Sequence, residues 1–416
     1  MRNVFDQYTQ PENKLTHALV CTLDSDRALL RPFLRWAGAK DVPPEHHLSI
    51  TEQQLPGDFT IDDNEEDGDG LPDAAFFTDD GWLFLIEAKV QSPIGVGQLQ
   101  RHRSTAIRKG FGSPQLALLT VDPSTPSMSK HAVHREWSEV YAWFRHRAKH
   151  SEWAQRFTEY MEILEARMIA KEYAVRGTLT KFDGLRFDDD HPYTYREAKR
   201  LIRLLGDKLQ PRKDLHQIGV DPNGDRRNAI TGRSGSRVWD FLPLEAARNA
   251  TSFTAYPHLT MGINRDNAVA AITVPNGVKG GFRTKLKELG EEGFFDLLRE
   301  IENTTRATRH RSVGARTVVY AIQRHFLSQR SSGSEDARLE ADVRTVVKGK
   351  RRDAKYQPQW ASAIYSVLTN KRSNIQFGAQ THFSYECPII RSAEATDLFA
   401  ETWLALSPLL DLVLDD

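Results

Sequence analysis

The sequence predicts an α/β domain with a mixed sheet at residues 1–171, followed by an α+β domain at residues 172–416. Three observations support this fold class. A chain of 416 residues is long for one hydrophobic core, so two domains are expected. Two apolar runs flank Asp79-Asp80-Gly81, which is the pattern of a β-hairpin. A helical segment and another apolar run follow, and they indicate a strand–helix–strand unit with parallel strands.

Composition narrows the class of protein. A hydrophobic content of 39% with 27% charged residues is ordinary for a globular chain. There is no apolar run of about 18 residues and no signal-peptide core near Met1, so we expect a cytoplasmic protein without a membrane span. The two cysteines, Cys21 and Cys387, fit a reducing compartment. Lys plus Arg equal Asp plus Glu at 56 each, so any nucleic-acid surface must arise from local clustering.

The chain opens with a helical pattern at residues 9–36. Thr9 fits an N-cap and Glu12 follows three residues later, so Glu12 is part of a capping box, a member of a site further along the chain, or both. A short strand is predicted near residues 48–51. The acidic stretch at 58–70 is interpreted as a solvated loop, since a calcium loop would need EF-hand spacing and a closing glutamate.

The predicted hairpin ends on Glu87-Ala88-Lys89. Side chains alternate along a strand, so Glu87 and Lys89 point to one face and Ala88 to the other. The hairpin also returns Asp73 toward Glu87. Two carboxylates and the Ala88 carbonyl then converge, and oxygens of this kind are the ligands that Mg²⁺ prefers. A lysine beside the metal would orient or deprotonate an attacking water.

Helices and strands continue after the hairpin. Residues 98–109 read as a basic helix on which Gln98 and His102 share a face. Residues 115–121 form the next predicted strand. One long helix or two helices are expected at 135–171, and their aromatic stripe is interpreted as core packing rather than base stacking.

These residues resemble a known family. Pro72-Asp73, followed by Glu87-x-Lys89 at the end of an apolar strand, resembles the PD-(D/E)XK nuclease superfamily. The segment Gln98-Leu99-Gln100-Arg101-His102 looks like the glutamine motif of its RecB-like branch, and Glu12 lies where such folds carry a glutamate in the first helix. The resemblance covers roughly residues 1–165. It implies a restriction-endonuclease-like αβββαβ core with a mixed sheet.

The resemblance also implies an activity: hydrolysis of phosphodiester bonds in DNA with Mg²⁺ or Mn²⁺, in a bacterial anti-phage or restriction-type role. It assigns the metal to Asp73, Glu87, the Ala88 carbonyl and Glu12. It assigns catalysis to Asp73, Glu87, Lys89 and Gln98. Lys89 would position or activate the water, and Gln98 would orient the substrate or the lysine. The helix after the strand would bind nucleic acid through Arg101, His102 and Arg103. The alternative interpretation is that these residues only form the solvent-exposed face of the helix.

Residues 172–416 carry no motif that we can name. The pattern predicts helices at 195–209, 282–302 and 313–329, and strands at 252–263 and 268–275. Basic residues gather between Arg299 and Lys355, either as a phosphate-binding surface or as a solvated helix face with a charged linker. An apolar helix at 394–415 is a candidate oligomer contact.

Two other functions stay open. One is a non-catalytic nucleic-acid-binding or assembly subunit on the same fold, although its usual mark, a missing acid or lysine, is not found at Asp73, Glu87 or Lys89. The other is a nuclease that cleaves RNA. DNA is the expected substrate, and because a toxic nuclease needs restraint, we also expect a homo-oligomer or a partner protein that activates or restrains it.

Overall fold

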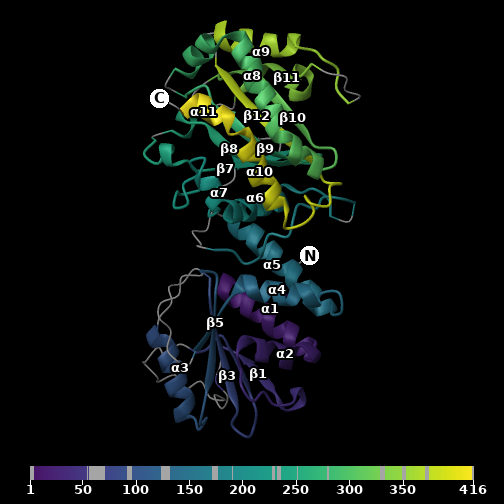
Figure 1. Cartoon of the computed structure of the whole chain (residues 1–416). Coiled ribbons are helices and arrows are strands. Elements are labelled where there is room, and N and C mark those ends of the chain that lie inside the picture. Colours follow the sequence, from purple (N-terminus) through teal and green to yellow (C-terminus); the bar gives the residue numbers. More distant parts are fainter. Residues whose placement is uncertain are drawn as a thin grey trace. The chain divides into compact units, whose positions relative to one another are not determined.

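The protein folds as two compact units, the first unit Met1–Lys181 and the second unit Phe182–Asp416 (Figure 1). The computed structural model describes residues 4–53, 55, 71–90, 96–122, 132–170, 177–189, 191–226, 230–231, 236–250, 252–278, 281–327, 333–348, 353–370 and 374–414. The acidic stretch 58–70 therefore lies outside the described residues. The boundary falls after Lys181 rather than after residue 171, because Leu179 is buried in the first core and its N–H donates to Glu165 Oε1 at 2.8 Å.

The described strands of the first unit form a five-stranded mixed sheet in the order β1-β2-β3-β4-β5. The strands are β1 (Ser49–Glu52), β2 (Ala74–Phe77), β3 (Leu83–Lys89), β4 (Gln115–Thr120) and β5 (Ala132–Glu136). The helices are α1 (Pro11–Ser25), α2 (Arg27–Ala37), α3 (Val96–Arg108), α4 (Trp137–Arg147) and α5 (Glu152–Ala170). The strands from β1 to β3 pair antiparallel and those from β3 to β5 pair parallel, so the predicted mixed sheet is confirmed.

The predicted hairpin joins β2 and β3. Phe77 pairs with Leu83, and the Thr78 N–H donates to the Trp82 carbonyl at 3.0 Å. Gly81 has φ +92°, in the left-handed region that glycine enters without a Cβ clash. The Asp-Gly signal therefore marked the turn correctly.

Helices cover both faces of the first sheet. Phe84 and Ile86 of β3 pack with α1, α2, α4 and α5, whereas Leu85 packs with α3 on the other face (Figure 1). The aromatic stripe predicted as core is buried, as its largest members show: Trp137, Phe144, Phe157 and Tyr160. Strand β5 was missed, because its residues merge into the helical pattern that begins near residue 135.

The described strands of the second unit form a seven-stranded antiparallel sheet in the order β11-β10-β12-β9-β8-β7-β6. The strands are β6 (Ile230–Thr231), β7 (Arg237–Leu242), β8 (His258–Asn264), β9 (Asn267–Val274), β10 (Arg316–His325), β11 (Ser334–Asp342) and β12 (Ile375–Ser384). The helices are α6 (Tyr195–Leu209), α7 (Lys213–His216), α8 (Phe282–Arg311), α9 (Gln359–Asn370), α10 (Ala395–Leu406) and α11 (Pro408–Leu414).

The helix predicted at 313–329 is wrong, since this segment contains strand β10. Its residues Thr317–Ile322 are mostly β-branched or aromatic, which disfavours a helix, and β10 is hydrogen-bonded to β11 on one side and β12 on the other. The apolar C-terminal stretch is explained within the second unit, because Leu409, Leu410 and Val413 are buried in its core. Among the described helices, none combines the length and the apolar character that crossing a membrane requires.

Candidate metal and carboxylate site at the end of strand β3

The end of β3 gathers the residues that the sequence singled out. The register that pairs Ala74 with Ile86 sets Asp73, just before β2, beside the last residues of β3. The Ala88 N–H donates to Asp73 Oδ2 at 2.6 Å. Strand alternation directs Glu87 away from the α1 side of the sheet, where Ile86 and Ala88 pack. The hairpin thus brings Asp73 and the Glu87-Ala88-Lys89 segment together.

Glu87 is a buried carboxylate held between two basic groups. Its side chain is 2% exposed, and Lys89 Nζ lies 2.6 Å from Oε1. His102 Nε2, from α3, lies 3.1 Å from Oε2 and is 1% exposed. Burial of a lone carboxylate is costly, so these two partners keep Glu87 in place. Lys89, at 15% exposure, reaches the surface side of the cluster.

Asp73 carries the clearest electrostatic signal of the site. The pKa of Asp73 is raised to about 7, first by burial and then by the neighbouring charge of Glu87. The Ala88 N–H bond, Lys89 and His102 act against this shift. Two carboxylates that meet away from water repel each other, and a hard cation bound between them would relieve the repulsion. The donor set of Asp73 and Glu87 therefore fits Mg²⁺ or Mn²⁺.

Glu12 contacts the end of β3 and does not cap its helix. Helix α1 begins at Pro11 with Gln10 as N-cap and without a side-chain cap hydrogen bond, so the capping box built on Thr9 is wrong. Glu12 Oε1 instead accepts a 3.3 Å hydrogen bond from the Val90 N–H, and the residue is 8% exposed. Glu12 is held beside the residue that follows Lys89, where the second interpretation expected it. Metal binding by Glu12 and by the Ala88 carbonyl stays a prediction.

Helix α3 contributes inward and outward residues. Gln98 is half-buried, Arg101 is exposed and Arg103 is half-buried. His102 was predicted to contact nucleic acid, but its ring is buried against Glu87 and has no surface at which to meet a strand. Its spacing with Leu99 and Ala106, both buried, follows the i, i+3, i+7 stripe of a core-facing side, and this signal would have placed it inside.

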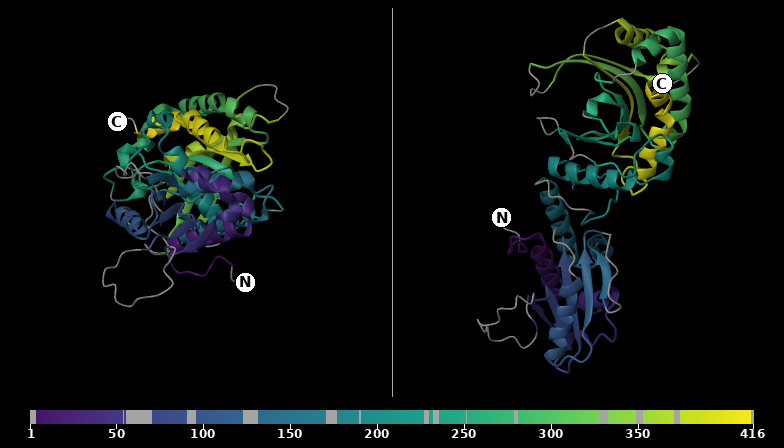
Figure 2. Two further views of the ribbon diagram at one scale, coloured as in Figure 1. Left: turned by 90° about the horizontal axis from the view of Figure 1, so that it is seen from below. Right: turned by 90° about the vertical axis from the view of Figure 1, so that its left-hand side faces the viewer.

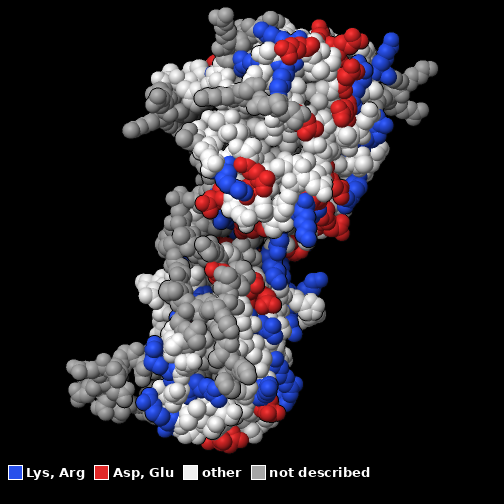
Figure 3. All heavy atoms as spheres, turned by 60° about the vertical axis from the view of Figure 1, so that its left-hand side comes forward, with Lys and Arg blue, Asp and Glu red and all other residues white. Residues whose placement is uncertain are grey.

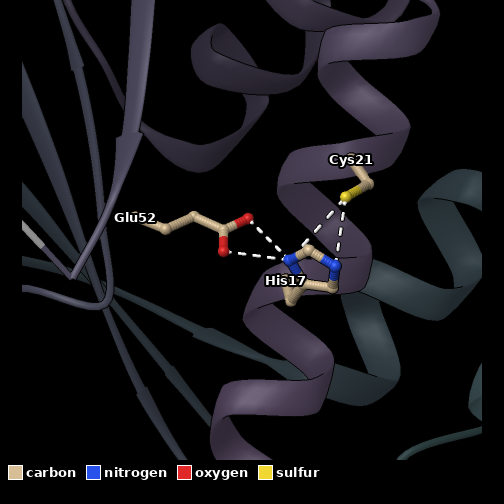
Figure 4. Close-up of side chains that lie close together, drawn as sticks. All are labelled: His17, Cys21 and Glu52. Carbon is tan, nitrogen blue, oxygen red and sulfur yellow. Dashed lines mark hydrogen bonds and ion pairs between the residues drawn. The ribbon is translucent and has the colours of Figure 1, made fainter. Parts of the chain in front are cut away.

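A second cluster in the first unit joins α1 to β1. His17 Nδ1 lies 2.9 Å from Glu52 Oε2, and Cys21 Sγ lies 3.4 Å from His17 Nε2 (Figure 4). The three ligand atoms lie within 4.8 Å of one another, so the group could hold a metal ion. Burial and the charge of Glu52 raise the pKa of Cys21 to about 11, which disfavours the thiolate that a metal needs. The His17–Glu52 pair already satisfies both groups, and we assign no metal here.

The basic residues predicted as a surface in the second unit are largely ion-paired. Arg306 and Arg309 both bind Glu302, at 2.7 and 3.0 Å. Arg311 pairs with Glu401. On the face shown in Figure 3, acidic and basic side chains of this unit are interspersed. Of the two interpretations, these contacts favour a solvated helix face. Arg330 and residues 350–352 lie outside the described part.

Comparison of the sequence with protein-family models and with curated proteins gives no match. The function of the chain is therefore inferred from the geometry at the end of β3 and from the resemblance of its motif.

Proposed function

We propose that the first unit is a metal-dependent nuclease of the PD-(D/E)XK type that hydrolyses phosphodiester bonds of DNA. The observation that carries this function is the meeting of Asp73, Glu87 and Lys89 at the end of β3, with both carboxylates largely out of water. The order α1-β1-β2-β3-α3-β4 supports it, because it follows the αβββαβ arrangement that the motif implies, with α2 added after the first helix.

Each residue has a defined role in this function. Mg²⁺ or Mn²⁺ bound by Asp73 and Glu87 would polarise the phosphate and lower the pKa of a bound water. Lys89 Nζ, which contacts Glu87, lies where it can donate to a water or to a phosphate oxygen beside that carboxylate. His102 is a positioning residue, because it holds Glu87 Oε2 and so orients the carboxylate. Gln98, on the same face of α3, would orient the substrate or the lysine.

The choice of DNA and of a bacterial anti-phage or restriction-type role follows from the resemblance alone. The RNA-cleaving alternative differs only in substrate. The non-catalytic alternative is disfavoured because the acids and the lysine are all present, with Lys89 on Glu87 and Asp73 hydrogen-bonded to the Ala88 N–H between them.

The test is cleavage of plasmid and linear DNA by the full chain in Mg²⁺, Mn²⁺ or EDTA, with Lys89→Ala beside the wild type. We expect metal-dependent cutting that falls by at least about 100-fold in the variant, the scale of a lost proton-transfer or positioning group. Lys149→Ala is the matched control, because Lys149 is exposed in the turn after α4. This control should cut like the wild type.

The alternatives give different results. Full cutting by Lys89→Ala and by Asp73→Asn would show that the site is elsewhere. Cleavage of RNA oligonucleotides but not of DNA oligonucleotides would show that the substrate is RNA. Salt-dependent DNA binding without cleavage in any metal would favour the binding subunit.

A further inference from the structure

The sheet of the second unit has two very different faces. Alternate residues such as Met261, Ile272 and Phe377 are apolar and pack against the helices. Those helices, among them α8, α10 and α11, lie on one side of the sheet (Figure 2). The opposite face carries arginine, threonine, glutamine and aromatic side chains at the alternating positions. A polar sheet face is common, but this one is hollowed.

A cavity of about 490 Å³ lies on that polar face. Three arginines line it, Arg237, Arg324 and Arg338, together with the aromatic residues Trp239, Tyr320 and Phe326. The described lining residues include no Asp or Glu. A volume of this size is typical of small-molecule sites. The cavity is therefore positively charged and offers aromatic surface.

Arg237 is the most constrained of the three arginines. Its guanidinium lies over Gly262, where an added Cβ would come within 3.1 Å of Nη2. Its Nε is buried and has no hydrogen-bond partner among the described groups. Burial is the largest cause that lowers the pKa of Arg237; Tyr320 raises this pKa, and the charges of Arg338 and Arg324 each lower it by a smaller amount. Like charges that converge on one cavity, with a donor left unpaired, indicate an anionic ligand.

The other two arginines differ in their partners: Arg338 is paired with carboxylates, whereas Arg324 contacts a neutral amide. Arg338 pairs with Glu335 and Glu340 of β11 at 3.1 Å each. Arg324 Nη1 donates to the Gln376 amide oxygen at 2.7 Å, which leaves its charge uncompensated by that contact. The positive charge in excess at the cavity is therefore that of Arg237 and Arg324. Guanidinium groups bind phosphate through paired hydrogen bonds, and phosphate is the anion that best matches several arginines.

The floor of the cavity combines hydroxyl groups with flat rings. Tyr320 Oη lies 3.1 Å from Thr273 Oγ1, which lies 3.1 Å from Thr260 Oγ1. The Tyr320 ring crosses Gly378, where a Cβ would lie 2.6 Å from the phenol oxygen. Trp239, on the other side of these hydroxyl groups, stacks with Phe241 at 6.4 Å between ring centroids. Such rings bind planar heterocycles, and the hydroxyl and amide groups can hydrogen-bond to their edges.

We propose that this cavity binds a nucleotide, with its phosphate held by Arg237 and Arg324 and its base against Trp239. The cavity volume and the buried Arg237 Nε favour a small ligand over a nucleic-acid strand. This site lies wholly in the second unit and is independent of the nuclease function proposed for the first.

The test is isothermal titration calorimetry on the full chain in EDTA, which keeps the first unit from acting on the probes. The probes are the four common ribonucleoside monophosphates and triphosphates, adenosine, inorganic phosphate and a single-stranded decanucleotide. We expect at least one nucleotide to bind with a Kd of about 1–100 μM, at least about tenfold tighter than adenosine or phosphate. Arg237→Gln should weaken it at least about tenfold. Trp239→Ala should weaken the nucleotide and leave phosphate binding unchanged.

Controls keep the result interpretable. Arg299→Gln removes an exposed arginine on α8 that pairs with Asp296, outside the cavity, and should bind like the wild type. Arg324→Gln, at a half-buried position, provides a second arginine variant if Arg237→Gln fails to fold. Absence of nucleotide binding at millimolar concentration would overturn the proposal. Nucleotide affinity unchanged in a folded arginine variant would also overturn it, as would a Trp239-dependent affinity for the decanucleotide alone.

Discussion

Glu87 is held by His102 and Lys89, one partner on each carboxylate oxygen. The Glu87 side chain is only 2% exposed, so loss of either partner would leave a charge that water cannot reach. Breaking this buried pair costs more free energy than breaking a surface ion pair, because the Glu87 carboxylate stays out of water after its partner is removed. The proposed site is therefore sensitive to substitution of a single residue that contacts Glu87.

His102→Ala should destabilise the first unit by about 2–4 kcal/mol, since Glu87 Oε2 loses its partner and a cavity forms. Urea unfolding in EDTA, followed by circular dichroism, measures this. His150→Ala is the control, because His150 is exposed after α4, and it should change stability by less than about 0.5 kcal/mol. Equal stability of the two variants would contradict the buried role of His102.

Asp73→Asn should change the pH dependence of stability. The folded pKa of Asp73 is about 7 against an ordinary 3.8, so the folded state retains a proton that the unfolded state has lost between these values. Stability conferred by Asp73 therefore falls as pH rises from about 4 to 7. Without metal, the variant should gain about 1–3 kcal/mol on the wild type between pH 5 and 8. If the unfolding free energies of the two proteins changed with pH in parallel, the raised pKa of Asp73 would be contradicted. Added Mg²⁺ should stabilise the wild type and not the variant.

At the scale of elements, β12 organises the second sheet. It lies between β9 and β10, and Gly378 pairs with Thr273 on one side and Tyr320 on the other. A Cβ at Gly378 would lie 2.4 Å from the Ile272 carbonyl oxygen, a backbone atom that cannot move alone. The close approach of these strands and the position of Tyr320 thus both depend on this glycine.

Gly378→Ala should lower the stability of the second unit by about 1–3 kcal/mol through strain between β12 and β9. Thermal unfolding followed by tryptophan fluorescence and circular dichroism is the measurement. Gly112→Ala, where no atom lies within 4 Å of an added Cβ, is the matched control and should behave as the wild type. An unchanged melting temperature for Gly378→Ala would rule out the predicted close contact.

At the scale of the whole molecule, the two units have separate cores. The largest core cluster draws only on residues from Phe182 onward, and the two others end at Leu179 and Leu118. Each unit buries its apolar side chains among its own residues, so each core is extensive enough to support the folding of its unit.

Fragments 1–181 and 182–416 should therefore each fold when produced separately. Circular dichroism and a cooperative thermal transition for each fragment would show this. If the nuclease function is correct, fragment 1–181 should retain the metal-dependent cutting that Lys89→Ala removes. An aggregated or unfolded fragment 1–181 would mean that the first core needs the rest of the chain.

The sequence by itself determined what depends on neighbours along the chain. The turn at Gly81, the alternation of Glu87 and Lys89, and the return of Asp73 follow from strand geometry over short separations. The predicted crossover from β3 through α3 to β4 likewise needed only the order of apolar runs. These local rules were enough to assemble the candidate site, apart from the inward turn of His102.

Only the tertiary structure decided what depends on distant partners. The β-branched residues of β10 favour a strand, but only its hydrogen bonds to β11 on one edge and β12 on the other decide its place in the sheet. The unit boundary follows Lys181 because Leu179 packs on α5, and the arginine-lined cavity brings together strands from β7 to β12. Sheet pairing joins residues far apart in sequence, and a linear pattern carries no record of which strands become neighbours.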